Sequence, residues 1–167
     1  MDYLSPAQLA GYVAFVFGIA AFSQKVDRRL KVLNGAQCVA YALHFMLLGN
    51  VPASAISAVA AARSFLALRF SSPLLAGAIV AVNLAIGAQV VTSWTGWLPV
   101  AASSLGTVAF VMMRGIPMRV VMLICCLMWL ANNILSGSIG GTMLESAIAL
   151  AMISTIVRMA RTPAPAT

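Results

Sequence analysis

The sequence predicts an all-α integral membrane protein with seven transmembrane helices, because charged residues are rare and widely separated. Of its 167 residues 62% are hydrophobic, and only 10 are basic and 3 acidic. Soluble domains carry roughly 25% charged residues, so a soluble protein is excluded. Three stretches have no formal charge: 31 residues over 32–62, 44 over 70–113 and 25 over 120–144. Since a spanning helix needs ~20 predominantly apolar residues, about seven closely spaced helices fill the chain.

Charged residues, prolines and glycines divide these stretches into predicted spans. The spans cover residues 7–24, 32–49, 52–69, 74–92, 98–113, 118–136 and 140–159. The first ends where four basic residues fall within 25–31, and the second begins after them. Pro52 and Pro73 stand where the third and fourth begin, since proline suits the first turn of a helix. Arg114 separates the fifth from the sixth, and glycines before residue 142 separate the sixth from the seventh.

The positions of lysine and arginine predict the orientation of the spans. Basic residues lie at 25, 28, 29, 31, 63, 69, 114, 119, 158 and 161. With seven spans and an outside N-terminus, all of them fall at or toward the cytoplasmic face, whereas 1–6, 50–52, 93–97 and 136–140 contain none. Because cytoplasmic loops are enriched in Lys and Arg, this asymmetry predicts an N-out, C-in protein. The net charge of +7 is therefore a topology signal.

The two halves of the sequence resemble each other at an offset of 88 residues, which aligns 11–70 with 99–158 without a gap. Nine of the 60 aligned positions are identical, and charged, aromatic and turn positions match as well. The aligned pairs include Gly18 with Gly106, Lys31 with Arg119, Cys38 with Cys126, Tyr41 with Trp129, and His44 with Asn132. This internal repeat predicts two parallel three-helix units, an arrangement known from transporters.

The predicted domains follow from this repeat. Residues 7–69 form a first three-helix bundle, 70–97 a linker helix with an outer loop, and 98–161 a second three-helix bundle. Residues 162–167, which alternate proline and alanine, form a disordered cytoplasmic tail. Two bundles related in this way place a solute site at their interface.

Polar side chains recur along one face of the second predicted span. At spacings of three, four and three residues, that face carries Asn34, Gln37, Tyr41 and His44. At the offset of 88, the sixth span carries Met122, Cys125, Trp129 and Asn132, with Asn133 beside them. Two matched stripes predict a cavity between the bundles. The alternative is interhelical hydrogen bonding, worth about 0.6 to 2 kcal/mol per contact.

Glu145 and Arg63 are charged residues within the predicted spans. Glu145 lies about five residues, or ~7 Å, from the outer end of the last span. An ionised acid costs ~2.5–3.5 kcal/mol at mid-helix, which favours a solute-binding or protonation role. The alternative is a buried carboxyl that caps the amides of residues 140–142. Arg63 lies six residues, or ~9 Å, from Arg69, and we expect it to snorkel to the cytoplasmic headgroups.

Four short segments carry a family resemblance. They are Gly-Tyr-Val-Ala-Phe at 11–15, Asp-Arg-Arg at 27–29, His-Phe-Met-Leu-Leu-Gly at 44–49 and Gly-Ser-Ile-Gly-Gly-Thr-Met-Leu-Glu at 137–145. With these segments the chain resembles the YgjV family of small bacterial inner-membrane proteins, from about residue 8 to residue 159. The resemblance implies a multi-pass protein of the bacterial inner membrane rather than a particular biochemical role.

The predicted architecture also resembles that of the SWEET sugar transporters and the PQ-loop class, in which a linker helix joins two parallel three-helix bundles. A Trp and an Asn from the bundles line the sugar site of SWEET proteins. Here Trp129 matches the Trp, whereas Glu145 and Ser57 occupy the helix that carries the Asn. The Pro-Gln dipeptide of the PQ class is absent. The resemblance therefore implies a transporter and leaves sugar specificity open.

Together these patterns predict an inner-membrane transporter that moves a small polar metabolite, a sugar or a related solute, by alternating access. The residues expected to contact the solute are Tyr41, His44, Trp129, Asn132, Asn133 and Glu145. Glu145 and His44 are expected to couple transport to protons, since an imidazole changes its charge near neutral pH. The alternative is a non-transporting membrane receptor or assembly partner, in which the polar stripes pair with each other in a dry interface.

Several other classes are not expected. The chain has one histidine, no nucleotide-binding loop and no Ser-His-acid set, so we predict neither an enzyme nor catalytic residues. It has no cluster of metal ligands, so we predict no metal and no cofactor. The expected partners are a small-molecule solute and the lipid bilayer, without nucleic acid, and a homo-oligomer is compatible with the sequence.

Overall fold

The protein is helical in the parts that the computed structural model describes, which are residues 5–47, 51–91, 94–135 and 139–161. The helices are α1 (Pro6–Phe22), α2 (Asp27–Leu47), α3 (Val51–Leu66), α4 (Pro73–Val90), α5 (Trp97–Met112), α6 (Gly115–Leu135) and α7 (Ile139–Ala160). A 3-10 turn, η1 (Trp94–Gly96), leads into α5. Side chains at 45, 51–53, 90, 133 and 139–141 lie outside the description.

Each of the seven predicted spans corresponds to one of these helices, and the main differences lie where α2 and α6 begin. α2 begins at Asp27 instead of residue 32, and α6 begins at Gly115 instead of residue 118. Asp27 lies in the first turn of α2, where a carboxylate interacts favourably with the positive end of the helix dipole. The basic residues that follow it are therefore helical. The predicted tail, 162–167, lies outside the described residues.

Local sequence explains several helix starts. The Ser5 hydroxyl accepts a hydrogen bond of 3.4 Å from the Gln8 amide at the start of α1. Pro6 and Pro73 occupy the first turns of α1 and α4, where a backbone N–H would have no intrahelical partner. Gly115 begins α6 with a φ of +64°, a left-handed conformation that glycine adopts without a steric penalty.

Three helices in the described part of the chain are long and apolar enough to cross a membrane, judged by length and composition. They cover Trp94–Met112, Gly115–Asn132 and Thr142–Ala160. Shorter apolar helices cover Pro6–Phe22, Ser54–Leu66 and Pro73–Gln89. At 1.5 Å per residue, the 17 residues of α1 extend ~25 Å, a little less than the ~30 Å of a hydrocarbon core. This set of helices is compatible with a multi-pass membrane protein.

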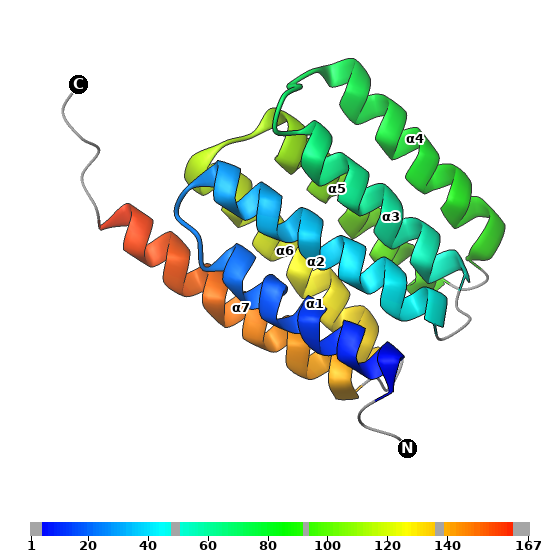
Figure 1. Ribbon diagram of the computed structural model, residues 1–167. Coiled ribbons are helices and arrows are strands. Elements are labelled where there is room, and N and C mark those ends of the chain that lie inside the picture. Colours follow the sequence, from blue (N-terminus) through cyan, green and yellow to red (C-terminus); the bar gives the residue numbers. More distant parts are fainter. Residues whose placement is uncertain (1–4, 48–50, 92–93, 136–138, 162–167) are drawn as a thin grey trace.

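The helices pack as two groups of three, with α4 at one edge (Figure 1). α2 packs against both α1 and α3, and α6 packs against both α5 and α7. The two groups meet where α1 contacts α7 and where α3 contacts α5. α4 packs mainly on α5 and more lightly on α3. The two groups are therefore joined by two helix contacts, with α2 in the middle of one group and α6 in the middle of the other, and α4 packs beside them.

The bounds of the second helix and the start of the third helix differ by 88 residues between the two groups. α2 covers 27–47 and α6 covers 115–135, while α3 begins at 51 and α7 at 139. The burial of side chains follows the same offset. Buried residues that lie 88 positions apart include Ala14 and Ala102, Ala21 and Ala109, Phe22 and Phe110, Leu30 and Met118, Lys31 and Arg119, and Ala61 and Ala149. Both groups thus bury corresponding positions.

The main hydrophobic core joins the two groups. It combines small residues such as Ala21 and Ala109 with larger ones such as Phe110, Met118 and Met152. Small side chains at helix crossings let the backbones approach closely, which drives helix association in a membrane. The core therefore fixes the contact between the groups.

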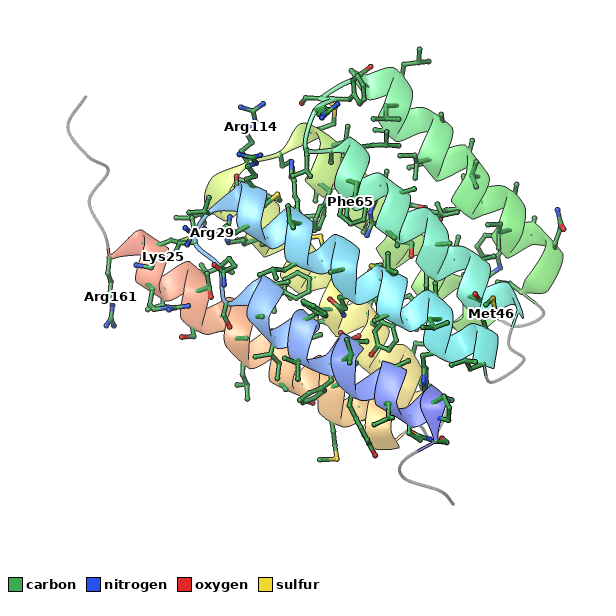
Figure 2. The ribbon with its side chains drawn as sticks, in the orientation of Figure 1. Lys25, Arg29, Met46, Phe65, Arg114 and Arg161 are labelled. Carbon is green, nitrogen blue, oxygen red and sulfur yellow. The ribbon has the colours of Figure 1, made fainter. Side chains whose placement is uncertain are left out.

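Basic side chains gather at one end of the bundle. Figure 2 shows Lys25, Arg29, Arg114 and Arg161 at the end where α1 and α7 finish, whereas Met46 lies at the other end. We call the first of these the basic end. It brings together Lys25 of the α1–α2 turn, Arg29 of the first turn of α2, Arg114 of the α5–α6 turn and Arg161 directly after α7, so these four basic residues cluster on one side as predicted.

Candidate functional site

Tyr41 and His44 lie on α2, and their rings face each other. The ring centroids are 6.3 Å apart at an interplanar angle of 57°. His44 Nδ1 donates a hydrogen bond of 2.7 Å to the Ala7 carbonyl oxygen of α1. The imidazole occupies space next to Gly11, where an added Cβ would lie 3.1 Å from Nδ1. The absence of a side chain at Gly11 therefore allows His44 to pack against α1.

Glu145 of α7 reaches the same region from the other group of helices. Its carboxylate oxygen Oε2 accepts a hydrogen bond of 3.0 Å from the Cys126 thiol, which also lies 3.2 Å from the Glu145 carbonyl oxygen. Tyr41 lies close enough for its hydroxyl to interact electrostatically with Glu145. Tyr41 of α2, which lies beside His44, is thus within electrostatic range of Glu145 of α7.

The remaining predicted solute contacts lie farther along α6. Trp129 and Asn132 follow Cys126 by three and six residues, and both are half-buried. The side chain of Asn133 lies outside the described residues. Of the six predicted solute contacts, the structure therefore pairs Tyr41 with His44, and it leaves Trp129 and Asn132 along the continuation of α6 beyond Cys126, which bonds Glu145.

Asn34 and Gln37 belong to the predicted stripe, but they are buried within the helix packing. The Asn34 amide donates a hydrogen bond of 2.8 Å to Ser64 Oγ and a longer one of 3.7 Å to Cys38 Sγ. Gln37 fills the space beside Gly18, where an added Cβ would lie 3.1 Å from its Nε2. The buried Oε1 of Gln37 has no hydrogen-bond partner. Asn34 thus forms a hydrogen bond between helices instead of lining a cavity. Gln37 leaves one buried acceptor atom, Oε1, without a hydrogen bond.

The expectation that Arg63 snorkels to the headgroups is wrong. Its side chain is only 7% exposed and points toward α5. Nη1 donates hydrogen bonds of 3.0 Å to the Ser103 carbonyl oxygen and 3.3 Å to Thr107 Oγ1. The guanidinium carbon lies 5.3 Å from the centre of the Phe110 ring, within cation–π distance. Gly106 leaves room for the charged group, so the contact between α3 and α5 holds Arg63 inside.

An ion pair at the basic end was not predicted from the sequence. Arg119 of α6 is almost fully buried and donates a 2.5 Å hydrogen bond to Asp27 Oδ1. It also donates to the carbonyl oxygens of Gln24, Lys25 and Gly115 at 2.9–3.3 Å. The Gly115 amide donates to Asp27 Oδ2 at 2.7 Å. These bonds fasten the start of α6 to the turn before α2.

Two apolar grooves lie between α3 and α4, away from Glu145. The first, of ≈ 210 Å³, is lined by Val59, Ala62, Arg63, Leu66, Ala78, Ile79 and Val82. The second, of ≈ 440 Å³, shares Leu66 and Ala78 with it and continues to Ser72 and Leu74. Neither groove includes a residue of the predicted solute site, and the sequence offered no signal for them because they depend on the spacing of two helices.

The helices, their apolar lengths and their one-sided basic end define an α-helical membrane protein. The sequence matches the family Imp-YgjV, described as bacterial inner membrane protein, over residues 5–163. It is 32% identical over 155 residues to the inner membrane protein YgjV of Escherichia coli (strain K12), which covers 93% of this chain and 85% of that protein. No solved structure matches the chain. The chain belongs to the YgjV family of bacterial inner membrane proteins.

Proposed function

We propose that the protein is an inner-membrane transporter that moves a small polar metabolite, a sugar or a related solute, by alternating access. The observation that carries this proposal is that Tyr41 on α2, which lies beside His44, is within electrostatic range of Glu145 on α7, because these helices belong to different groups. Polar groups contributed from both sides of an interface can bind a solute in one arrangement of the two sides and release it in another.

The proposal includes a SWEET-like architecture of two parallel bundles, residues 7–69 and 98–161, joined by the linker helix within 70–97. The displacement of 88 residues between the bounds of α2 and α6, and between the starts of α3 and α7, supports a duplicated three-helix unit. The matching burial at positions such as Ala21 and Ala109 supports it as well. Duplication would explain why α1 meets α7 while α3 meets α5, since a two-fold axis exchanges these two contacts.

We propose an N-out, C-in orientation with the basic end in the cytoplasm. Lys25, Arg29, Arg114 and Arg161 share that end, in keeping with the excess of basic residues in cytoplasmic loops. Trp94 lies near the opposite end of α5 with 73% of its surface exposed, which suits the outer interface where indole rings prefer to lie.

In this proposal the solute lies between the two bundles in the membrane. Tyr41, His44 and Glu145 contact it first, and Trp129, Asn132 and Asn133 extend the site along α6. The lipid bilayer and the solute are the partners; the protein acts on no covalent bond and needs no metal or cofactor.

Glu145 and His44 are the residues that we propose couple transport to protons. In vesicles that contain the reconstituted protein, an inward proton gradient should accelerate solute uptake, and Glu145→Gln should remove this dependence on the gradient. Ser57→Ala is the matched control, because Ser57 lies 88 positions before Glu145 in the other bundle. Uptake by Glu145→Gln that equals the wild type at every pH would contradict proton coupling.

A thermal-shift screen of the detergent-purified protein tests the proposal itself. The compounds are sugars, nucleosides, amino acids and organic acids, measured on the wild type and on Glu145→Gln. Binding stabilises the folded state by mass action, about 2.7 kcal/mol at a ligand concentration of 100 Kd. A compound that stabilises only the wild type supports a solute site at Glu145. If no compound stabilises either protein, the receptor or assembly-partner function becomes the better account.

A further inference from the structure

Arginines of the second group of helices hold the α1–α2 turn of the first group. Arg119 of α6 pairs with Asp27 and donates hydrogen bonds of 2.9–3.3 Å to the carbonyl oxygens of residues 24–25. Arg158 of α7 donates a hydrogen bond of 2.9 Å to the Ser23 carbonyl oxygen. Two side chains from different helices therefore fasten the two groups to each other at the basic end.

The proposed solute site lies far from these contacts along the helices. Tyr41 follows Asp27 by 14 residues on α2, which is ~21 Å at 1.5 Å per residue. Glu145 precedes Arg158 by 13 residues on α7, which is ~20 Å. Met152 of the main hydrophobic core lies between them on α7. Packed apolar side chains and then the arginine contacts thus separate the solute site from the basic end.

The arginine contacts lie where water can replace them. Residues 23–25 stand between α1 and α2, so their carbonyl oxygens can hydrogen-bond to water without the loss of a helix. The side chain of Asp27 is 25% exposed. Arg119 also donates a hydrogen bond of 2.9 Å to the Gly115 carbonyl oxygen of its own helix, which does not depend on the other group. These contacts can therefore break and form again while the helices stay intact.

We propose that Asp27, Arg119 and Arg158 form a gate that closes the interface between the two groups at the basic end. Release of the two arginines from the α1–α2 turn separates α2 from α6 at that end and opens a path toward Glu145. The gate rests on the alternating-access function proposed above, in which the solute site opens to each side in turn. In this structure the gate is closed.

Distances between spin labels on α2 and α6 measure the opening, by double electron–electron resonance of the full-length protein in lipid nanodiscs. The first pair, Val32→Cys with Val120→Cys, lies near the basic end, and the second pair, Leu47→Cys with Leu135→Cys, lies at the opposite end. All four positions are exposed, and each pair joins residues 88 positions apart. Because the labels stand in helices, loosening of the turn alone does not move them. The three native cysteines are replaced by alanine.

Arg119→Gln should add a population in which the first distance is longer by on the order of 5 Å, the size of helix displacements in such transitions, without lengthening the second distance. Asp27→Asn should act in the same direction, because it removes the charge and keeps an oxygen for the Gly115 amide. Lys31→Met is the matched control: Lys31 is buried 88 positions before Arg119, but it bonds the Ala67 carbonyl oxygen directly after α3. It should change neither distance.

Thermal unfolding establishes which variants are folded. An unchanged first distance in the folded variants of Arg119 and Asp27 would overturn the gate. Equal lengthening of both distances would also overturn it, because the groups would then have loosened as a whole.

The native thiol of Cys126, which bonds Glu145, measures access to the solute site. With alanine at positions 38 and 125, the neutral reagent iodoacetamide should label Cys126 in detergent solution about tenfold faster in Arg119→Gln than in the wild type, since reaction of a buried group follows the population of the open form. Lys31→Met should leave the rate unchanged. Equal rates in Arg119→Gln and the wild type would overturn the path to Glu145.

Neither measurement requires a solute, so the gate and the transporter can fail separately. A gate that opens in a protein that no compound stabilises would count against the transporter and support the gate. A protein that binds a solute at Glu145 but whose basic end stays closed in Arg119→Gln would overturn the gate alone.

Discussion

The two groups of helices, α1–α3 and α5–α7, bury corresponding positions and fill them with different chemistry. In the first, the Asn34 amide donates a 2.8 Å hydrogen bond to Ser64 Oγ, and both residues are buried. In the second, the residues 88 positions later are Met122 and Met152, which belong to the hydrophobic core. The pattern of buried positions therefore determines the helix arrangement, while the chemistry at those positions can differ.

Two ionisable side chains, Arg63 and Glu145, have no ionisable counterpart 88 positions away in the other group of helices. Arg63 stands in α3, and the residue 88 positions later is Ala151 in α7. Glu145 stands in α7, and its counterpart in α3 is Ser57. The first group thus carries a buried cation where the second has alanine, and the second carries an acid where the first has serine. The solute site that we propose between the two groups is therefore asymmetric.

The largest expected effect comes from the unequal roles of Arg119 and Lys31, two buried basic residues 88 positions apart. Lys31 donates one hydrogen bond, of 3.0 Å, to the Ala67 carbonyl oxygen. Arg119 holds Asp27 and three carbonyl oxygens. We expect Arg119→Met to lower the free energy of unfolding by ~3 kcal/mol, because it leaves Asp27 without its countercharge, and Lys31→Met to lower it by about 1 kcal/mol.

Denaturant unfolding in detergent micelles, followed by tryptophan fluorescence, measures both changes. Arg114→Met is the control, because Arg114 is exposed at the same end of the bundle. Equal losses for Arg119→Met and Lys31→Met would mean that the ion pair adds nothing beyond an ordinary hydrogen bond.

A second comparison exchanges the side chains of Asn34 and Met122, which occupy corresponding buried positions in the two groups. Met122→Asn places an amide in the hydrophobic core that also contains Met152, so we expect a loss of ~2 kcal/mol. Asn34→Met removes the bond to Ser64, whose hydroxyl still donates to the Ala60 carbonyl oxygen at 2.8 Å, so we expect about 1 kcal/mol. The same unfolding measurement ranks the two variants, and a larger loss for Asn34→Met would reverse the interpretation of these positions.

The smallest expected effect concerns the glycines where the groups cross. A Cβ at position 18 would lie 3.1–3.3 Å from Gln37 and Ile148, whereas a Cβ at position 106 would lie 3.3 Å from Arg63 and at least 3.6 Å from other side chains. We expect Gly18→Ala to lower stability by about 1 kcal/mol. Gly106→Ala should change it by less, because the higher helix propensity of alanine offsets part of the strain. Shifts in melting temperature, with Gly77→Ala as the open-space control, test this order.

The helices could be predicted from the sequence because each depends on local composition and on the charged residues, prolines and glycines at its ends. Pro73 marks a start that the structure retains, and the seven predicted spans each overlap a helix. The sequence predicts a later start for α2 because Arg28 and Arg29 resemble loop residues. In the structure Asp27 supplies a favourable negative charge in the first turn, which offsets the unfavourable effect of the basic side chains that follow it.

The candidate site was predicted only in part, because partners on other helices decide where a side chain goes. The periodicity of α2 correctly placed Tyr41 near His44. Periodicity could not indicate that Asn34 would form a hydrogen bond with Ser64, or that Gly106 would leave room for Arg63. The offset of 88 aligns Asp27 with Gly115 near the start of α6, at the same end of the bundle. The ion pair between Asp27 and Arg119, however, depends on how the two groups of helices pack.

The ion pair between Asp27 and Arg119 has a consequence for how the protein is made. Translation produces Asp27 with the first helices, and its partner follows 92 residues later. Chains fold as they are synthesised, from the N-terminal part onward. Until α6 enters the membrane, the nascent chain therefore carries a carboxylate and the Gln24 and Lys25 carbonyl oxygens without their donor. The hydrogen bonds at this end of α2 are therefore completed only when α6 has been inserted.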